Sequence, residues 1–278
     1  MYKTILVHVD GTAESAPRID IAARLALLHD AHLVGTASTG IASYVFPVGD
    51  IGAGLPIINF PIEELRAEAD RALDAFEGTV RQAGVSKFER RRIDEEAGMA
   101  VCMQARYADL VIISQRVPKQ FLIGLRADFP EYVLLNCARP ALVVPAAGIQ
   151  GAVGKRVAVA WNGSADAVRA ITSAIPLLRA ADEVNLVVLN ADTQAGLHGQ
   201  EPGADMALYL ARHGVRLTVT ARETELEAGE ALLSCAADMR ADLIVMGAYG
   251  HSRFREILLG GTTRAVLHTS LLPLWMAH

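Results

Sequence analysis

The sequence repeats itself, and this repeat constrains the fold more than any other feature. A chain of 278 residues has room for about two domains of average size. The order of the matching segments is the same in the two copies. We therefore interpret the chain as two tandem copies of one fold. The matching pairs are Lys3–Thr12 with Lys155–Ser164, Ala108–Ile113 with Ala241–Met246, Cys102 with Cys235, and Pro140 with Pro273.

Within each copy, strand-like and helix-like segments alternate, and each copy has five strands. Such alternation predicts an α/β fold with a parallel sheet, covered on both faces by helices in right-handed crossovers. The fold class expected from the sequence is therefore two tandem, doubly wound, five-stranded parallel sheets of the Rossmann-like type. In the first copy the expected strands are 3–10, 32–37, 88–93, 109–113 and 141–144, and the expected helices are 15–28, 63–83, 97–107 and 132–136.

The domain boundaries follow from the repeat. We expect a first domain at residues 1–146 and a second at 152–278, joined by a small, uncharged linker around 146–154. The alignment at the start of the copies has a longer offset than the alignment near their ends, so the first copy contains extra residues. These most plausibly lie in the nearly uncharged segment 38–61, whose role as a lid, a partner surface or a flap over the core stays open.

Composition excludes several classes of protein. Hydrophobic residues make up 52% of the chain, which suits buried parallel sheets and argues against disorder. The net charge of −5 gives no general attraction to nucleic acid. No apolar run is long enough for a membrane span, and the first residues show no signal-peptide cleavage site, so we expect a cytoplasmic protein. The three cysteines are widely spaced among apolar residues, which is typical of reduced core thiols. Their spacing does not match that of a zinc site.

A glycine-rich stretch in the second copy is the clearest candidate site. The apolar strand 243–246 ends at Gly247 and Gly250, and a helical pattern resumes after Gly260. Glycine lets backbone N–H groups approach a ligand, and a helix N-terminus favours an anion, so this arrangement predicts a phosphate site. The alternative is that the glycines only form turns. Other candidate contacts in this stretch are Tyr249, His251, Arg253, Gly261, Thr262 and Thr263.

The order Gly247-x2-Gly250-x9-Gly260 resembles the nucleotide-binding signature of the universal stress protein family. That family usually has Ser or Thr directly after the third glycine, whereas this chain has Gly261 there. The resemblance covers nearly the whole chain and implies an adenine nucleotide alpha hydrolase-like fold. It also implies ATP or a related adenine nucleotide as ligand, and association through edge strands or domain faces. On this basis we expect a stress-response sensor or regulator that forms a homodimer in addition to its internal pseudo-dimer.

The first copy has lost the glycine signature. Ser114 stands at the position of Gly247, Val117 at that of Gly250, Ala127 at that of Gly260 and Asp128 at that of Gly261. A β-branched residue where glycine is needed and a carboxylate where phosphate would lie both disfavour an anion. We therefore expect only the second domain to bind nucleotide, with the first as its structural partner.

Strand ends supply the remaining candidates. Asn162 and Gly163 follow the first strand of the second copy, and Asn190 ends its second strand. The resemblance places an Asp contacting adenine at the position of Asn162, and the first copy keeps this Asp as Asp10. A carboxamide also pairs with adenine, because it offers both a donor and an acceptor. The alternative is that Asn162 only caps the following turn.

Two other functions remain open from the sequence. His251 is the one candidate base beside the glycines, so a slow adenine-nucleotide hydrolase is one alternative. No catalytic triad or lysine-bearing phosphate loop is evident, and we expect no dedicated enzyme. A nucleotide-independent interaction scaffold is the other. The sequence also leaves open whether Mg²⁺ accompanies the nucleotide.

Overall fold

The computed structural model describes residues 1–41, 61–115, 128–149, 151–191, 201–249 and 261–278. Strands and helices alternate throughout, as the sequence predicted. The first half contains β1 (Thr4–His8), α1 (Ser15–His29), β2 (His32–Ser38), α2 (Ile62–Gln82), β3 (Phe88–Ile93), α3 (Ala97–Ala105), β4 (Leu110–Ser114), α4 (Phe129–Asn136) and β5 (Ala141–Val144). The second half contains β6 (Arg156–Ala160), α5 (Ala165–Leu178), β7 (Glu183–Leu189), α6 (Ala204–Arg212), β8 (Thr218–Arg222), α7 (Ala228–Asp238), β9 (Leu243–Gly247), α9 (Gly261–Thr269) and β10 (Leu274–Ala277).

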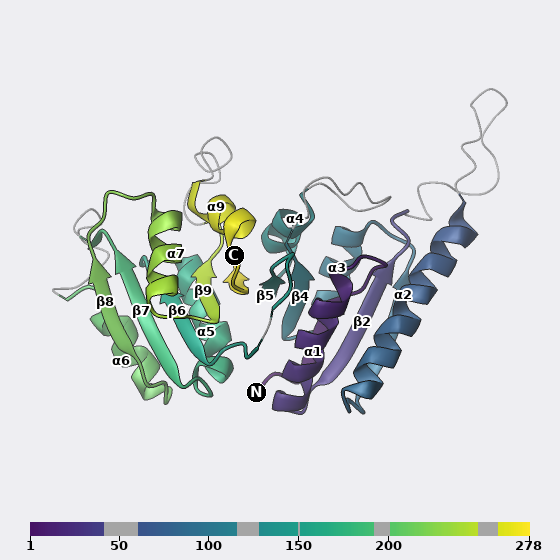
Figure 1. The fold of residues 1–278 in the computed structure, drawn as a ribbon, viewed down its shortest axis with the longest axis horizontal. Helices are drawn as coiled ribbons and strands as arrows, with labels where there is room; N and C mark the ends of the chain where they lie inside the picture. The colour runs from purple at the N-terminus through teal and green to yellow at the C-terminus, as the bar shows by residue number, and fades with distance from the viewer. Residues whose placement is uncertain (42–60, 116–127, 150, 192–200, 250–260) are drawn as a thin grey trace, which may run out of the picture.

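All ten strands join in one sheet, with the order β3-β2-β1-β4-β5-β10-β9-β6-β7-β8 (Figure 1). Within each half the five strands are parallel, so the predicted fold class is confirmed. The sequence did not predict that the two sheets would be continuous. They meet where β5 pairs with β10, and this is the antiparallel pair of the sheet.

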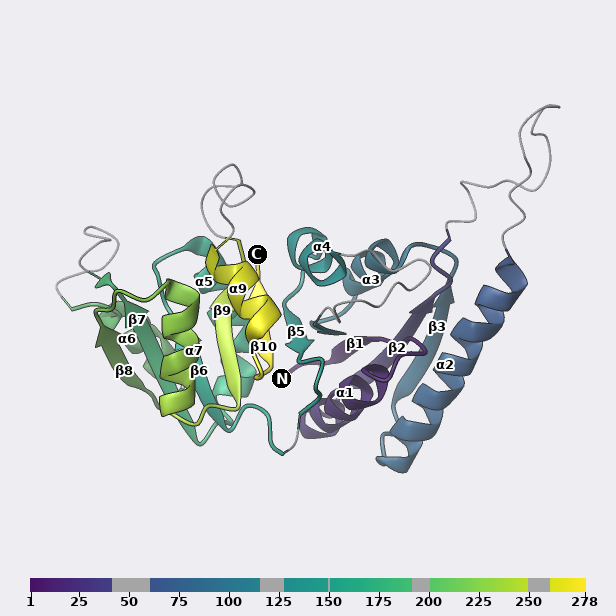
Figure 2. The same ribbon diagram turned by 45° about the horizontal axis from the view of Figure 1, so that its top comes forward.

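The register of that pair is symmetric. Leu142 faces Trp275, and these two residues are equivalent in the repeat; Ala141 faces Met276 and Val143 faces Leu274. A local two-fold axis therefore passes through the Leu142–Trp275 pair, as it would at a symmetric dimer interface. Both termini lie near this junction (Figure 2).

Hydrogen bonds repeat between the halves. The carboxylate of Asp109 accepts from the N–H groups of Lys3 and Thr4 before β1. The carboxylate of Asp242 accepts from those of Lys155 and Arg156 before β6, and also from Gly154. Asp242 therefore caps the start of β6 as Asp109 caps the start of β1. The two halves are thus copies in detail, although the boundaries 1–146 and 152–278 and the association of two chains stay predictions.

Alternate residues of each strand enter two hydrophobic cores, one on each face of the sheet. Helices α1, α2, α5 and α6 cover one core, whereas α3, α4, α7 and α9 cover the other. In β1, for example, Ile5 and Val7 face the first core and Leu6 faces the second. The strands are apolar on both faces because both faces are covered. No helix in the described parts of the chain is long and apolar enough to cross a membrane.

Gly35 of β2 allows α2 to pack closely on the sheet. A Cβ atom at this residue would lie 2.6 Å from Cε1 of Phe76, whose side chain is fully buried. We expect Gly35→Ala to lower the free energy of unfolding by about 1–3 kcal/mol, the usual cost of overpacking a core. Urea denaturation followed by circular dichroism measures this change.

Gly78→Ala is the matched control. Gly78 is exposed on α2, and a Cβ atom there meets no other atom within 4 Å. We expect this substitution to stabilise the protein by up to about 1 kcal/mol, because alanine favours a helix over glycine. Equal effects of the two substitutions would contradict the packing described for Gly35.

Candidate functional site

The strand order of the second half changes direction at β6. Its partner β7 follows it in the chain, whereas its other partner β9 comes three strands later. Ligands of doubly wound sheets bind outside the carboxyl ends of the strands at such a switch point. The candidate ligand sites therefore lie after β6 and at the end of β9, and at the matching places after β1 and β4 in the first half.

Asn162 lies in a tight turn after β6. Its Oδ1 atom accepts a hydrogen bond of 3.1 Å from the N–H of Ser164, and the hydroxyl of Ser164 caps α5 by accepting from the N–H of Ala167. Gly163, between them, has a φ of 74°, which favours glycine. The capping role that the sequence left open is therefore present. The side chain of Asn162 is nevertheless exposed, and its amide N–H₂ group makes no hydrogen bond within the described residues.

Gly247 ends β9 and touches the first turn of α5. A Cβ atom there would lie 2.6 Å from the backbone nitrogen of Ala167 and 2.8 Å from the carbonyl carbon of Asp166. Its φ lies outside the left-handed range, so glycine is needed here for close packing and not for an unusual backbone angle. This contact brings the carboxyl end of β9 against the N-terminus of α5, beside the turn of Asn162.

Thr263 links the end of β9 to α9. The buried Thr263 hydroxyl accepts a hydrogen bond of 3.2 Å from the N–H of Tyr249, which has a φ of 55°. Gly261 begins α9 and is exposed, and a Cβ atom at Gly261 would meet no described atom within 4 Å. The expected strand end and helix start are present as the end of β9 at Gly247 and the start of α9 at Gly261. Thr262 lies beside Gly261, partly buried in the first turn.

Asn190 follows β7 with a φ of 51°. Its side-chain Oδ1 accepts a hydrogen bond of 2.8 Å from the N–H of Thr224, and its own N–H donates to the carbonyl of Arg222. These two bonds hold the ends of β7 and β8 together. The described contacts of Asn190 are therefore structural, which the sequence did not indicate.

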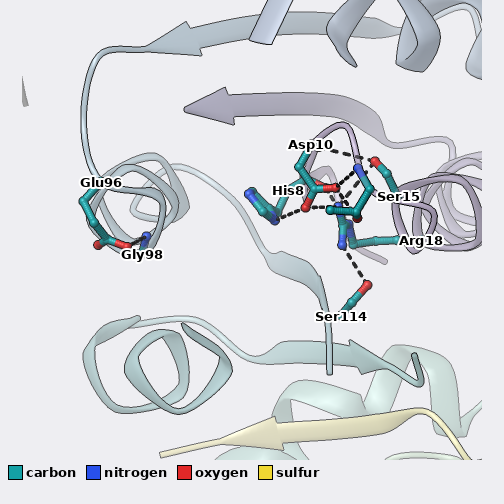
Figure 3. Close-up of polar contacts among 8 residues, drawn as sticks. His8, Asp10, Ser15, Arg18, Glu96, Gly98 and Ser114 are labelled. Atoms are coloured by element: carbon teal, nitrogen blue, oxygen red, sulfur yellow. Dashed lines mark hydrogen bonds and ion pairs between the residues drawn. The ribbon is translucent and has the colours of Figure 1, made fainter. Parts of the chain in front are cut away.

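The switch point of the first half, between β1 and β4, holds a buried cation. Arg18 of α1 is 2% exposed, and its guanidinium donates to the carbonyl of His8 at 2.6 Å and to the hydroxyl of Ser114 at 2.7 Å. It also pairs with Oδ2 of Asp10 at 3.0 Å and reaches the hydroxyl of Ser15 at 3.4 Å (Figure 3). Because His8 ends β1 and Ser114 ends β4, the guanidinium lies at the switch point of this half.

The charges around Arg18 are balanced within the chain. Burial disfavours the charged form of Asp10, but Arg18, His8 and the hydrogen bonds from Thr12 together hold its pKa below the usual range. Burial lowers the pKa of His8 to about 4, although Asp10 attracts a proton to it. The His8 ring is therefore neutral at pH 7; it lies 4.8 Å from the ring of Phe129, and its Nδ1 has no hydrogen-bond partner.

The two switch points share a turn but differ in what fills them. Asp10 accepts from the N–H of Thr12 at 3.0 Å, as Asn162 does from that of Ser164. Alanines stand in the second half where the first has His8 and Arg18; these are Ala160 and Ala170. Ala170 is fully buried and brings no charge, so the second half has no internal cation at this place.

Comparison with known proteins relates the second half to a known family. The model of the universal stress protein family matches residues 154–278. The match to a universal stress protein domain thus lies in the second half of the chain. "Universal stress protein Slr1230" of Synechocystis is 26% identical over 214 residues, which cover 74% of this chain and 70% of that protein.

Solved structures share the fold of the whole chain. A universal stress protein from Archaeoglobus fulgidus superposes with a TM-score of 0.75 and 18% identity, covering 99% of this chain and 97% of that chain. A functionally unknown protein from Pseudomonas aeruginosa superposes with a TM-score of 0.63 and 15% identity, covering 99% and 92%. The arrangement of two halves is therefore present in both of these solved structures.

The structure brings part of the predicted site together. Asn162, Gly163 and Gly247 lie around the first turn of α5, and Tyr249 and Thr263 join the end of β9 to α9. The predicted contacts that lie outside the described residues are Gly250, His251, Arg253 and Gly260, as are Val117 and Ala127 of the first half. In the described residues no group of three His, Cys, Asp or Glu side chains is placed to hold a metal ion.

Sequence reasoning missed the Arg18 cluster of the first half. A signal was present, because Arg18 falls on the same helical face as Ser15, Ala22 and Ile19, and that face is buried. A charged residue on a buried stripe requires a partner, and Asp10 was the nearest carboxylate expected at a strand end. The same reasoning identifies Asp166 in α5, a buried carboxylate that accepts a hydrogen bond from the guanidinium of Arg169 and whose Oδ1 lies 3.8 Å from Nδ1 of His278.

The Arg18–Asp10 pair is testable by a double-mutant cycle. We expect Arg18→Ala to lower the free energy of unfolding by about 3–5 kcal/mol, because it leaves a largely buried carboxylate without its cation. Adding Asp10→Asn removes that carboxylate and copies the residues of the second half, so the double variant should be more stable than Arg18→Ala alone. Urea denaturation of all four proteins gives the coupling. Simple additivity would contradict the ion pair.

His8 predicts a dependence of stability on pH. Its pKa is about 4 in the folded protein, below the ordinary value of 6.5 in the unfolded chain. Between these values the unfolded state binds more protons, so stability falls as the pH drops from 6.5 towards 4, by up to about 3 kcal/mol. Denaturant titrations at several pH values measure the slope.

His8→Ala, which copies Ala160, should make that slope shallower. His29 would contribute to any slope that remains between these pH values, because burial also lowers its pKa. Asp10 acts in a separate window: because folding lowers its pKa, the stability that it contributes is present above about pH 4 and is lost as the pH falls further. An unchanged slope in the His8→Ala variant would show that His8 is not buried in its neutral form.

Proposed function

We propose that the second half binds ATP or a related adenine nucleotide at the switch point between β6 and β9, and that its occupancy acts as a stress-response signal. One contrast supports this proposal most directly. A guanidinium fills the first switch point, whereas alanines replace both His8 and Arg18 in the second. The universal stress protein domain matches this second half.

The base would be recognised at the turn after β6. The exposed amide of Asn162 keeps its N–H₂ group as a donor, while its oxygen is held by the N–H of Ser164. This fixes the direction of the donor before a ligand arrives, which lowers the entropic cost of binding. An adenine ring nitrogen is a suitable acceptor for such a group.

The phosphates would bind at the start of α9. The first turn of a helix has N–H groups without partners in the helix, and its dipole favours an anion. In this chain α9 begins at the exposed Gly261, and Thr263 ties that turn to the end of β9. The matching start of the first half carries Asp128 before α4, where a carboxylate would repel phosphate.

Binding, more than turnover, suits these residues. The groups described around the turn of Asn162 and the start of α9 are backbone N–H groups, hydroxyls and an amide, which bind phosphate and base. The ionisable groups described beside Gly247 are paired with one another: the buried Asp166 carboxylate pairs with Arg169 and lies 3.8 Å from Nδ1 of His278. Nucleotide occupancy would then report its concentration to a partner through states that bind it differently. Mg²⁺, if it accompanies the phosphates, would offset their charge.

Calorimetric titration with ATP tests the proposal. We expect one nucleotide per chain, and Asn162→Ala should weaken binding by about 5- to 150-fold, which corresponds to the loss of about 1–3 kcal/mol at a base-reading amide. Gly247→Ala should also weaken binding, because its Cβ atom would push the end of β9 away from α5.

Asp10→Asn is the matched control for this titration. It gives the first half the residue that the second half has, while Arg18 still occupies that switch point, so both affinity and stoichiometry should stay unchanged. A second bound nucleotide in this variant would mean that Arg18 does not close the first site. Absence of ATP, ADP and AMP binding by the wild-type protein would favour an interaction scaffold instead.

A further inference from the structure

Two cysteines of the first half, distant in sequence, lie on helices that touch. Cys102 is in α3, and Cys137 is the residue that ends α4. The two helices pack side by side on the same face of the sheet (Figures 1 and 2). Gly98 makes the contact close, because a Cβ atom there would lie 2.6 Å from the ring of Tyr132 in α4.

The two thiols lie along this contact. Cys102 follows Gly98 in α3, and Cys137 follows Tyr132 in α4, by about one helical turn in each case. The interaction of the two thiols raises the pKa of Cys102 and lowers the pKa of Cys137, and neither sulfur is in a disulfide. Cys137 is 8% exposed and belongs to the core beneath α3 and α4, whereas Cys102 packs against that core and is only half-buried. Cys102 is therefore reachable from solvent, and Cys137 belongs to the core against which Cys102 packs.

The second half provides an internal comparison. Its equivalent of Cys102 is the buried Cys235 in α7, and its equivalent of Cys137 is Ser270 after α9. Ser270 repeats the backbone contact of Cys137, since their N–H groups donate to Val266 and Val133, which are also equivalent. The repeat thus keeps the geometry of the position but places a second sulfur only in the first half.

We propose that Cys102 and Cys137 are a modification site, at which a hydroperoxide oxidises the two thiols to a reversible intramolecular disulfide between α3 and α4. Formation of the disulfide brings the two sulfurs from this helix contact to the S–S bond length of about 2.05 Å. The helices themselves need not move, since they are already packed together.

The reaction balances in two steps. The sulfur of Cys102, which solvent reaches, attacks one oxygen of the hydroperoxide; an S–O bond forms, the O–O bond breaks, and the thiol proton leaves with the alcohol or water. The sulfur of Cys137 then attacks the resulting sulfenic acid; the S–S bond forms, the S–O bond breaks, and the departing hydroxide takes the proton of Cys137 to become water. Two thiols are oxidised, and one hydroperoxide is reduced.

Peptide mapping of the full-length protein after treatment with hydrogen peroxide tests the proposal. We expect a cross-linked peptide that joins Cys102 to Cys137, a loss of two free thiols per chain, and recovery of both thiols with dithiothreitol. Cys235→Ser should give the same result. Cys102→Ser and Cys137→Ser should each abolish the cross-link, and Cys137→Ser copies the residue that the second half already has.

Folding of the variants is checked by circular dichroism, but the decisive measurement needs no variant. The wild-type protein is equilibrated in glutathione buffers from reducing to oxidising, and the cross-linked fraction is measured by mass. A transition that follows the buffer potential supports the site. The proposal is overturned if the pair stays reduced in the oxidising buffers, if the cross-link involves Cys235, or if it forms only between chains.

Discussion

The antiparallel pair of β5 and β10 is the contact on which the rest of the structure depends. All residues of these strands are buried, and β10 includes Trp275, whose large side chain is fully enclosed. In an isolated half, such a strand would be an exposed apolar edge, which promotes aggregation. Pairing the two edges covers both and merges two five-stranded sheets into one of ten strands. Side chains strengthen this junction: the Trp275 indole donates to the hydroxyl of Ser173, and Tyr2 donates to its carbonyl.

The two halves joined at this contact have the same fold but different side chains at their switch points. Each half keeps the carboxylate that caps its first strand and the turn after that strand, because these contacts determine the backbone. The side chains at the two switch points do not determine the backbone in this way and differ between the halves. Arg18 occupies one of these switch points with contacts to strand ends, and the other has alanines at the positions of His8 and Arg18.

Much of the fold could be predicted from the sequence, because the hydrophobic periodicity indicates the strands and helices and the repeat indicates two similar halves. The expected strands and helices of the first half are present with small shifts at their ends; α2, for example, covers Ile62–Gln82 where 63–83 was expected. The joining of the two sheets could not be predicted, since a strand covered by helices and a strand paired to another sheet both appear as short apolar runs. The repeat specified two equal units but not the contact between them.

The candidate site was less predictable than the fold. Glycines after β9 were read as ligand-binding, and Gly247 instead has a packing reason that depends on how near α5 lies. Thr263 and Asn190 were expected to face a ligand, yet their described hydrogen bonds join elements of the protein. Such bonds connect residues that are distant in sequence, and only the folded arrangement determines which partner a polar side chain finds.

The Arg18 cluster also shows why the first half could not regain a ligand site by one substitution. Removal of Arg18 alone leaves Asp10 charged and largely buried, with a neutral His8 beside it. A carboxylate in that place repels phosphate, so the emptied position would still disfavour an anion. Removal of Asp10 alone leaves the guanidinium buried without its counter-charge, which is equally unfavourable. The residues of such a cluster can only be exchanged together, and the second half differs from the first at all of them: Ala160, Asn162, Ala170 and Gly247 replace His8, Asp10, Arg18 and Ser114.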